Sequence, residues 1–138
     1  MKVFASVATV LGVAAMSLVA PADAAGKYDG STPMICAALM VTECGADGRC
    51  QYRTAEAVNL PSLLRVDAKA MKVRNLEAEK GRESPIKNAD HSTGRLVLQG
   101  SDSEHGWTMV IHEETGKMSG TVSGDGEGFV VFGQCALP

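Results

Sequence analysis

Aromatic residues are scarce in this sequence, at 4% of 138 residues, and positive charge is not in excess, because the formal net charge is −3. Proteins that bind single-stranded nucleic acid stack its bases on aromatic side chains, and they neutralise its phosphates with an excess of Lys and Arg. Neither requirement is met here. The composition therefore predicts no nucleic acid partner.

The sequence also lacks the spacings that mark redox and zinc cysteines. Its four cysteines are Cys36, Cys44, Cys50 and Cys135. Thioredoxin-like redox pairs need C-x-x-C, and zinc sites use spacers of about two to four residues between paired cysteines. Five residues separate Cys44 from Cys50. An even number of cysteines in an exported chain instead predicts two disulfides.

The pairing of these cysteines stays open, because four cysteines allow three connectivities. The segment between Cys44 and Cys50 is "GADGR", and its Asp and Gly are typical of a turn. This favours a disulfide across a hairpin. Cys36 and Cys135 would then join the first strand of the domain to the last.

Catalytic motifs are absent as well. There is no G-x-S-x-G nucleophile elbow. Asp90, His91 and Ser101 form a triad only on paper, because triads are recognised by geometry. His112 and Glu114 lie two residues apart at a strand end, but no third metal ligand follows at a recognisable spacing. The sequence therefore predicts no catalytic residue, no metal site and no cofactor.

An apolar segment opens the chain. Residues 3–20 follow Lys2 without a charge, and the tripeptide ADA at 22–24 fits a signal peptidase site. This predicts that residues 1–24 are a signal peptide and that the protein is periplasmic or secreted. The alternative is a transmembrane anchor, but the run is at the short end of a span and lacks a basic flank. We therefore expect no stable membrane anchor after cleavage.

The rest of the chain has the pattern of one β domain. Residues 25–34 are polar, with Gly and Pro, and predict a flexible lead-in, whereas 35–138 predict a single disulfide-stapled domain. Apolar and polar residues alternate with a period of two between turn residues, which predicts strands. The expected strands are 35–43, 50–53, 63–79, 85–88, 94–101, 107–113, 117–123 and 129–135.

Three segments depart from simple alternation. Thr54 is expected to cap one short helical turn. Within 63–79 the inward face changes parity between Ala70 and Met71, so we expect a bulge or bend there that keeps Met71 and Val73 inward. The strand 85–88 begins at a proline and is expected at a sheet edge.

Many closely spaced strands with almost no helix predict a small antiparallel up-and-down β-barrel of about eight strands, lipocalin-like in architecture. Closure of the barrel would leave no exposed edge. Barrels of this size are either filled by side chains or hold one small ligand. The residues expected to face a ligand or to form the core are Leu64, Val66, Ala68, Leu96, Leu98, Trp107, Met109 and Ile111.

A family resemblance is carried by the segments "ICAALMVTEC", "GRLVLQG" and "GWTMVIHEETGKMSGTVS". They resemble a family of small secreted, periplasmic proteins of Gram-negative bacteria. The resemblance covers most of residues 33–136, and it implies compartment and domain extent. It implies no activity and no catalytic residue.

These observations predict an exported, non-enzymatic β-barrel that acts as a periplasmic binding or interaction module. Its expected partner is a small apolar ligand or a periplasmic protein. The alternative is an enzyme inhibitor or accessory subunit that presents the loop 44–50 or 101–106, because loops on a stiff scaffold commonly carry binding. A small hydrolase has the least support, since no catalytic constellation is evident.

Overall fold

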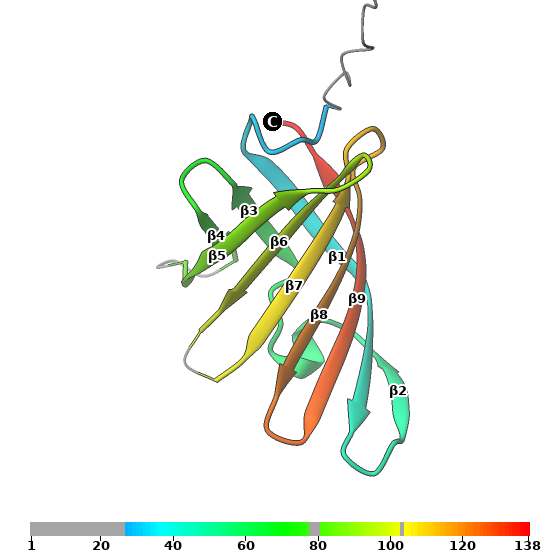
Figure 1. Ribbon diagram of the computed structural model, residues 1–138. Coiled ribbons are helices and arrows are strands. Elements are labelled where there is room, and N and C mark those ends of the chain that lie inside the picture. Colours follow the sequence, from blue (N-terminus) through cyan, green and yellow to red (C-terminus); the bar gives the residue numbers. More distant parts are fainter. Residues whose placement is uncertain (1–26, 78–80, 103) are drawn as a thin grey trace, which may run out of the picture.

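The computed structural model describes residues 27–77, 81–102 and 104–138, which form a closed antiparallel β-barrel (Figure 1). The elements are β1 (Met34–Gly45), β2 (Cys50–Arg53), the 3-10 turn η1 (Glu56–Val58), β3 (Leu63–Asp67), β4 (Lys72–Asn75), β5 (Glu83–His91), β6 (Arg95–Ser101), β7 (Gly106–His112), β8 (Lys117–Gly124) and β9 (Glu127–Ala136). Strand order is β2-β1-β3-β4-β5-β6-β7-β8-β9, and β1 also pairs with β9. Eight strands therefore close the barrel, and the predicted fold is confirmed.

The long strand β1 explains why one of the nine strands stays outside the ring. Its first part, from Met34 to Ala37, pairs with β3, and its later part, from Val41 to Cys44, pairs with β2. On its other side β1 pairs with β9 over nearly its whole length, with a register shift between Ala38 and Met40. The extra residue of this bulge is Leu39, and β2 extends the sheet beyond the barrel.

The interior of the barrel is packed with the inward-facing residues of the alternating strands. A period of two sends successive side chains to opposite faces, so each strand contributes every second residue to the core. Leu96, Leu98 and Ile111 are almost completely buried. Of the eight residues predicted to face inward, Val66, Leu96, Leu98, Met109 and Ile111 are buried, and Leu64, Ala68 and Trp107 are half-buried and pack against them.

Trp107 occupies space that a neighbouring glycine leaves free. Gly100 lies directly opposite Trp107 on the adjacent strand. A Cβ atom added at Gly100 would collide with the Trp107 ring and with the Pro85 carbonyl. The indole Nε1 donates to Ser84 Oγ at 2.8 Å, so the polar end of this half-buried side chain has a partner.

Both disulfides join residues that are directly opposite each other on neighbouring strands. Cys36 pairs with Cys135 across β1 and β9, with their Cα atoms 3.9 Å apart. Cys44 pairs with Cys50 across β1 and β2, with their Cα atoms 4.0 Å apart. The favoured connectivity is therefore the one observed.

One predicted strand is in fact two. The segment 63–79 was expected to bend near residue 70 and continue, but β3 and β4 form a hairpin whose turn covers 68–71. Asp67 Oδ1 accepts from the Ala70 amide at 2.9 Å, which stabilises the turn. Met71 adopts a positive φ of 53° and is exposed, so its predicted inward position is wrong, whereas Val73 is buried as predicted.

The strand predicted at 85–88 is longer and lies in a different place. It belongs to the nine-residue β5, which pairs with β4 on one side and β6 on the other. The expected sheet edge is wrong, because closure leaves β5 between two partners. A register shift between Ile86 and Asn88 accommodates the irregular strand after the proline.

The segment before the barrel is held against one of its ends. Residues 1–24, the predicted signal peptide, lie outside the described residues. Part of the expected flexible lead-in, from residue 27, forms turns in which the Tyr28 amide donates to the Glu113 carbonyl at 2.8 Å. Gly30 is buried there with a positive φ of 82°. The predicted helical turn is η1, but its N-cap is Ala55, which makes no side-chain cap, and not Thr54. Thr54 Oγ1 precedes the turn and accepts from the Ala57 amide at 3.3 Å.

Candidate functional site

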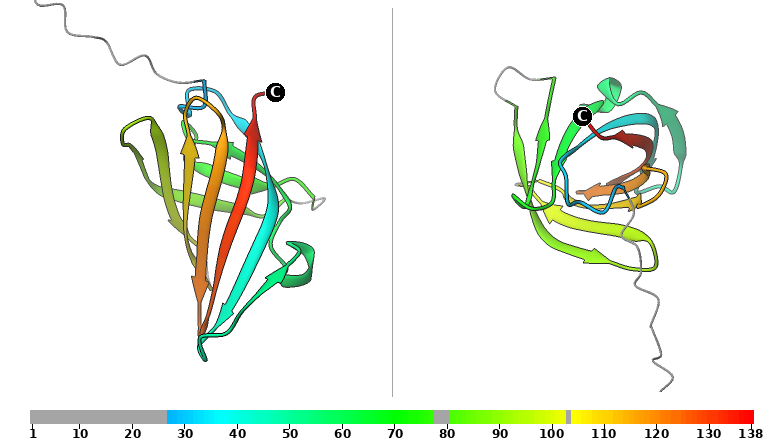
Figure 2. Two further views of the ribbon diagram at one scale, coloured as in Figure 1. Left: turned by 90° about the vertical axis from the view of Figure 1, so that its right-hand side faces the viewer. Right: turned by 90° about the horizontal axis from the view of Figure 1, so that it is seen from above.

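Large apolar side chains gather on the outer face of β1 and β9. Leu39 is 64% exposed and Phe132 is 49% exposed, and Met40 and Val130 are also exposed. Figure 2 shows β8, β9 and β1 side by side in its left-hand view, so these residues share one continuous surface. An exposed group of large apolar side chains often marks an interaction site.

This surface is hollowed. The hollow measures about 440 Å³ and is predominantly apolar. It crosses five strands of the barrel, from β1 through β9, β8 and β7 to β6. The lining residues are Leu39, Met40, Arg95, Val110, His112, Lys117, Met118, Ser119, Phe132, Gly133 and Gln134.

The register between strands builds one side of the hollow. Met40 lies opposite Phe132, Phe132 opposite Ser119, and Ser119 opposite Val110. These four residues therefore form one outward row across β1, β9, β8 and β7. The bulged Leu39 extends the apolar end of this row, because it lies beside Met40 at the register shift.

A second row, two residues along the strands, carries positive charge. Arg95 lies opposite His112, and Lys117 lies opposite Gln134. Within the described residues, neither Arg95 nor Lys117 has a carboxylate within 4.0 Å. None of the residues that line the hollow is acidic. His112 Nδ1 accepts from the Glu114 amide at 3.4 Å, which leaves Nε2 available to a ligand.

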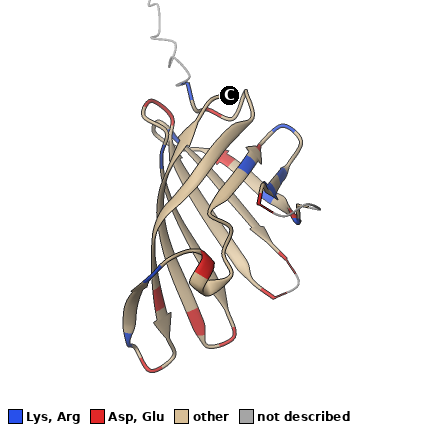
Figure 3. Cartoon of the chain, turned by 180° about the vertical axis from the view of Figure 1, so that it is seen from behind, with Lys and Arg blue, Asp and Glu red and all other residues tan. Residues whose placement is uncertain are grey.

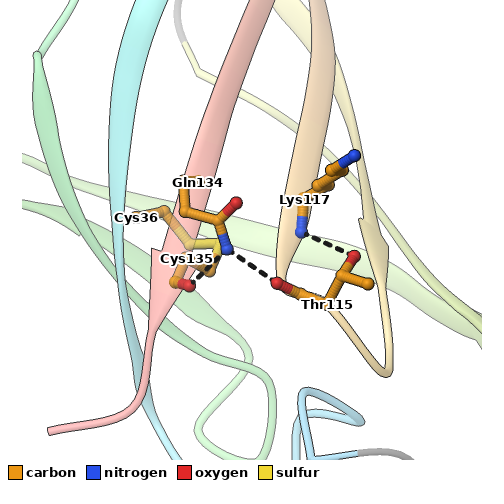
Figure 4. The surroundings of a disulfide bond; sticks show 5 residues. All are labelled: Cys36, Thr115, Lys117, Gln134 and Cys135. Carbon is orange, nitrogen blue, oxygen red and sulfur yellow. Dashed lines mark hydrogen bonds between the residues drawn. A yellow bond between two sulfur atoms is a disulfide. The ribbon is translucent and has the colours of Figure 1, made fainter.

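Gln134 fixes one end of this second row. Its Nε2 donates to the Thr115 carbonyl at 2.7 Å and to the Cys135 carbonyl at 3.0 Å. Figure 4 shows these bonds between β9 and the turn before β8, beside the disulfide of Cys135. The Lys117 amide donates to Thr115 Oγ1 at 3.3 Å, so the turn that Gln134 bonds also holds the Lys117 backbone.

Some cations elsewhere on the barrel are paired with carboxylates. Lys72 Nζ lies 3.2 Å from Glu83 Oε1, and the Arg74 guanidinium donates to the same oxygen. The Arg74 hydrogen bond, followed by that of Lys72, holds the pKa of Glu83 below its ordinary value. Figure 3, which shows the molecule from behind, has blue and red segments close together in this region. The cations beside the hollow differ from these in having no such partner.

The residues considered for catalysis do not form a site. Asp90 and His91 lie at the end of β5. His91 pairs with Leu96 near the start of β6, whereas Ser101 lies at the opposite end of β6. His91 Nδ1 instead lies 2.6 Å from Glu113 Oε1. In the described part of the chain, no group of three or more His, Cys, Asp or Glu side chains could hold a metal ion.

A histidine links two loops at the other end of the barrel. His105 Nδ1 lies 3.8 Å from Asp102, and its Nε2 lies 3.7 Å from Glu127. Asp102 Oδ1 accepts from the backbone amides of Glu104 and His105. The Glu104 hydrogen bond, then that of His105 and the His105 charge, lower the pKa of Asp102 from its ordinary 3.8.

The lowered pKa of Asp102 predicts a pH-dependent contribution to stability. A folded-state pKa below the unfolded value adds stability above pH 3.8, and this is lost as the pH falls through the folded-state pKa. Asp102→Asn should lower the free energy of unfolding near neutral pH by less than about 1 kcal/mol, because solvent screens the group. Urea titrations should show that the difference shrinks in acid. An equal difference at both pH values would contradict an ionic role.

The sequence contains a signal for the outer hollow that the alternation of apolar and polar residues does not reveal. Val130 and Phe132 occupy outward positions of β9, yet the segment 129–132 is apolar throughout. A strand with one face in water usually alternates, so apolar residues at both parities indicate that both faces are apolar. Leu39 and Met40 give the same signal in β1.

Two further findings bear on the class of protein. Among the described ranges, the structure has no helix with the length and apolar character needed to cross a membrane. The two disulfides are consistent with an oxidising compartment. Comparisons with protein-family models, with curated proteins and with solved structures found no match to this chain.

Proposed function

We propose that the protein is an exported, non-enzymatic β-barrel that acts as a periplasmic binding module and binds its partner in the outer hollow. The observation that carries the proposal is the exposed apolar row of Leu39, Met40 and Phe132 beside that hollow. The proposal places the protein with the small secreted proteins of Gram-negative bacteria that it resembles.

Packing favours the outer hollow over the barrel interior as the binding site. Leu96, Leu98 and Ile111 have at most 1% of their surface exposed, and they meet in one core cluster. A ligand inside the barrel would have to displace these side chains, which costs packing and cavity energy. The outer hollow requires no such displacement, because its apolar side chains already face water.

A neutral fluorescent probe, N-phenyl-1-naphthylamine, tests whether the hollow binds apolar groups. The oxidised wild type should increase the fluorescence of the probe. The double substitution Leu39→Ser and Phe132→Ser should weaken binding about tenfold, because it removes the apolar surface that the probe would cover. Fluorescence titration gives both dissociation constants.

Leu63 provides a matched control, because it is 42% exposed on β3 and does not line the hollow. Leu63→Ser should leave the affinity for the probe unchanged. Circular dichroism and the melting temperature should show that all variants remain folded. Absence of probe binding, or equal losses in the two variants, would overturn the hollow as the binding site.

A second candidate function is an enzyme inhibitor or accessory subunit. It is favoured by the hairpin between Cys44 and Cys50, where the disulfide and the bond from the Arg49 amide to Asp47 Oδ1, at 3.0 Å, fix the loop. Arg49 lies in the loop of this hairpin, and its side chain is 89% exposed. A partner that loses affinity with Arg49→Ala but not with Phe132→Ser would favour this function.

A further inference from the structure

We infer that the hollow takes a single-chain anionic amphiphile, with its apolar chain on β1 and β9 and its anionic head at Arg95 and Lys117. This inference rests on the proposed function and adds the chemical class of the ligand. A long-chain carboxylate is the simplest member of that class.

The two ends of the hollow differ in chemistry. At the β1 and β9 end the lining side chains are Leu39, Met40 and Phe132. At the β6 to β8 end they include Arg95 and Lys117. Along the curved sheet, Lys117 on β8 lies two strand spacings from β1, about 10 Å, and Arg95 on β6 lies four, an arc of about 19 Å. An extended chain with a charge at one end matches this polarity.

No carboxylate neutralises the cations at the charged end of the hollow, so this end is suited to bind an anionic group. Arg95 and Lys117 have no ion-pair partner among the described residues, and the lining residues include no Asp or Glu. Arg95 presents a planar guanidinium that binds carboxylates in a bidentate manner, and Lys117 adds a second charge. His112 Nε2 can donate a further hydrogen bond.

Size and overall charge favour a free amphiphile over a bilayer surface. The hollow of about 440 Å³ lies in the range of small-molecule sites, about 300–1,000 Å³. Attraction to an anionic bilayer commonly uses clusters of about four to eight Lys or Arg. This chain offers two such cations at the hollow and carries a net charge of −3.

Calorimetric titration of the exported, oxidised protein with dodecanoate tests the inference, at concentrations below micelle formation. Dodecanoate should bind with a stoichiometry near one, and dodecyltrimethylammonium, which has the same chain and the opposite charge, should bind at least about tenfold more weakly. The double substitution Arg95→Gln and Lys117→Gln should raise the Kd of dodecanoate about tenfold, which corresponds to about 1.4 kcal/mol.

A matched pair of exposed lysines controls for net charge. Lys69 and Lys87 are exposed on other parts of the barrel, so Lys69→Gln with Lys87→Gln should leave the dodecanoate Kd unchanged. Equal effects of the two double variants, or equal affinity for the two amphiphiles, would overturn the inference. Binding to anionic phospholipid vesicles without binding to monomeric dodecanoate would also overturn it.

The neutral naphthylamine probe separates this inference from the proposed function. Arg95→Gln with Lys117→Gln should weaken binding of the probe much less than binding of dodecanoate, because the probe carries no charge. If the probe binds at the apolar row but dodecanoate shows no preference over the cation, the anionic ligand is wrong and the binding module stands. If neither binds, both proposals fail.

Discussion

Removal of the Cys36–Cys135 disulfide is expected to lower the free energy of unfolding by about 4.7 kcal/mol. The bond closes a loop with a sequence separation of 99 residues, and a cross-link of that length removes much of the conformational entropy of the unfolded chain. Both sulfurs are buried in the core, next to the closing pair of strands. Chemical denaturation of Cys36→Ala with Cys135→Ala, compared with the oxidised wild type, measures the loss.

The second disulfide supplies the control for this prediction. Cys44 and Cys50 have a sequence separation of 6, for which the same chain-entropy relation gives about 2.2 kcal/mol. Cys44→Ala with Cys50→Ala should therefore cost about half as much. Equal losses for the two pairs would show that loop length does not govern their contributions.

Gly133→Ala is expected to lower the free energy of unfolding by about 1–3 kcal/mol, the usual cost of overpacking. Gly133 faces inward on β9, opposite Met118 on β8 and Ala38 on β1. A Cβ atom there would collide with the Ala37 carbonyl oxygen and with Met118 Cε. The carbonyl belongs to the backbone of the closing strand, so it cannot move aside as a side-chain end could. Urea denaturation measures the loss.

Gly128 is the matched control on the same strand. A Cβ atom at Gly128 would meet its nearest neighbour, the Val122 carbonyl oxygen, at 3.9 Å, which is ordinary contact. Gly128→Ala should therefore leave the stability nearly unchanged or raise it slightly, because alanine restricts the unfolded chain more than glycine does. A similar loss at both glycines would show that strand propensity, and not the collision at Gly133, controls the effect.

The barrel could be predicted because the alternation of apolar and polar residues that marks each strand is a local feature of the sequence. Segments such as 94–101 and 117–123 alternate apolar and polar residues between turn residues, and the structure has β6 and β8 there. The error in 63–79 arose where alternation continued through a turn, since Ala68 and Ala70 keep the apolar parity although residues 68–71 leave the strand. Alanine fits a turn as readily as a strand, so hydropathy alone did not separate the two.

The candidate site could not be predicted in the same way, because it depends on pairing between distant strands. Phe132 and Met40 become neighbours only through the register of β9 on β1, and the bulge at Leu39 sets that register. Arg95 joins them from β6 through three further ladders. No local pattern contains this information. The apolar outward positions of β1 and β9 were visible in the sequence, but not the hollow that they form.

The shared edge of β1 imposes an order on folding. Its pairs with β2 and β3 form between segments close in the chain, whereas its pairing with β9 must close a loop of about a hundred residues, and such non-local contacts form slowly. Until β9 pairs with it, β1 therefore has one unpaired edge. Early oxidation of Cys44 with nearby Cys50 would leave Cys36 with no partner except Cys135. The disulfide of the short hairpin thus directs formation of the disulfide between β1 and β9.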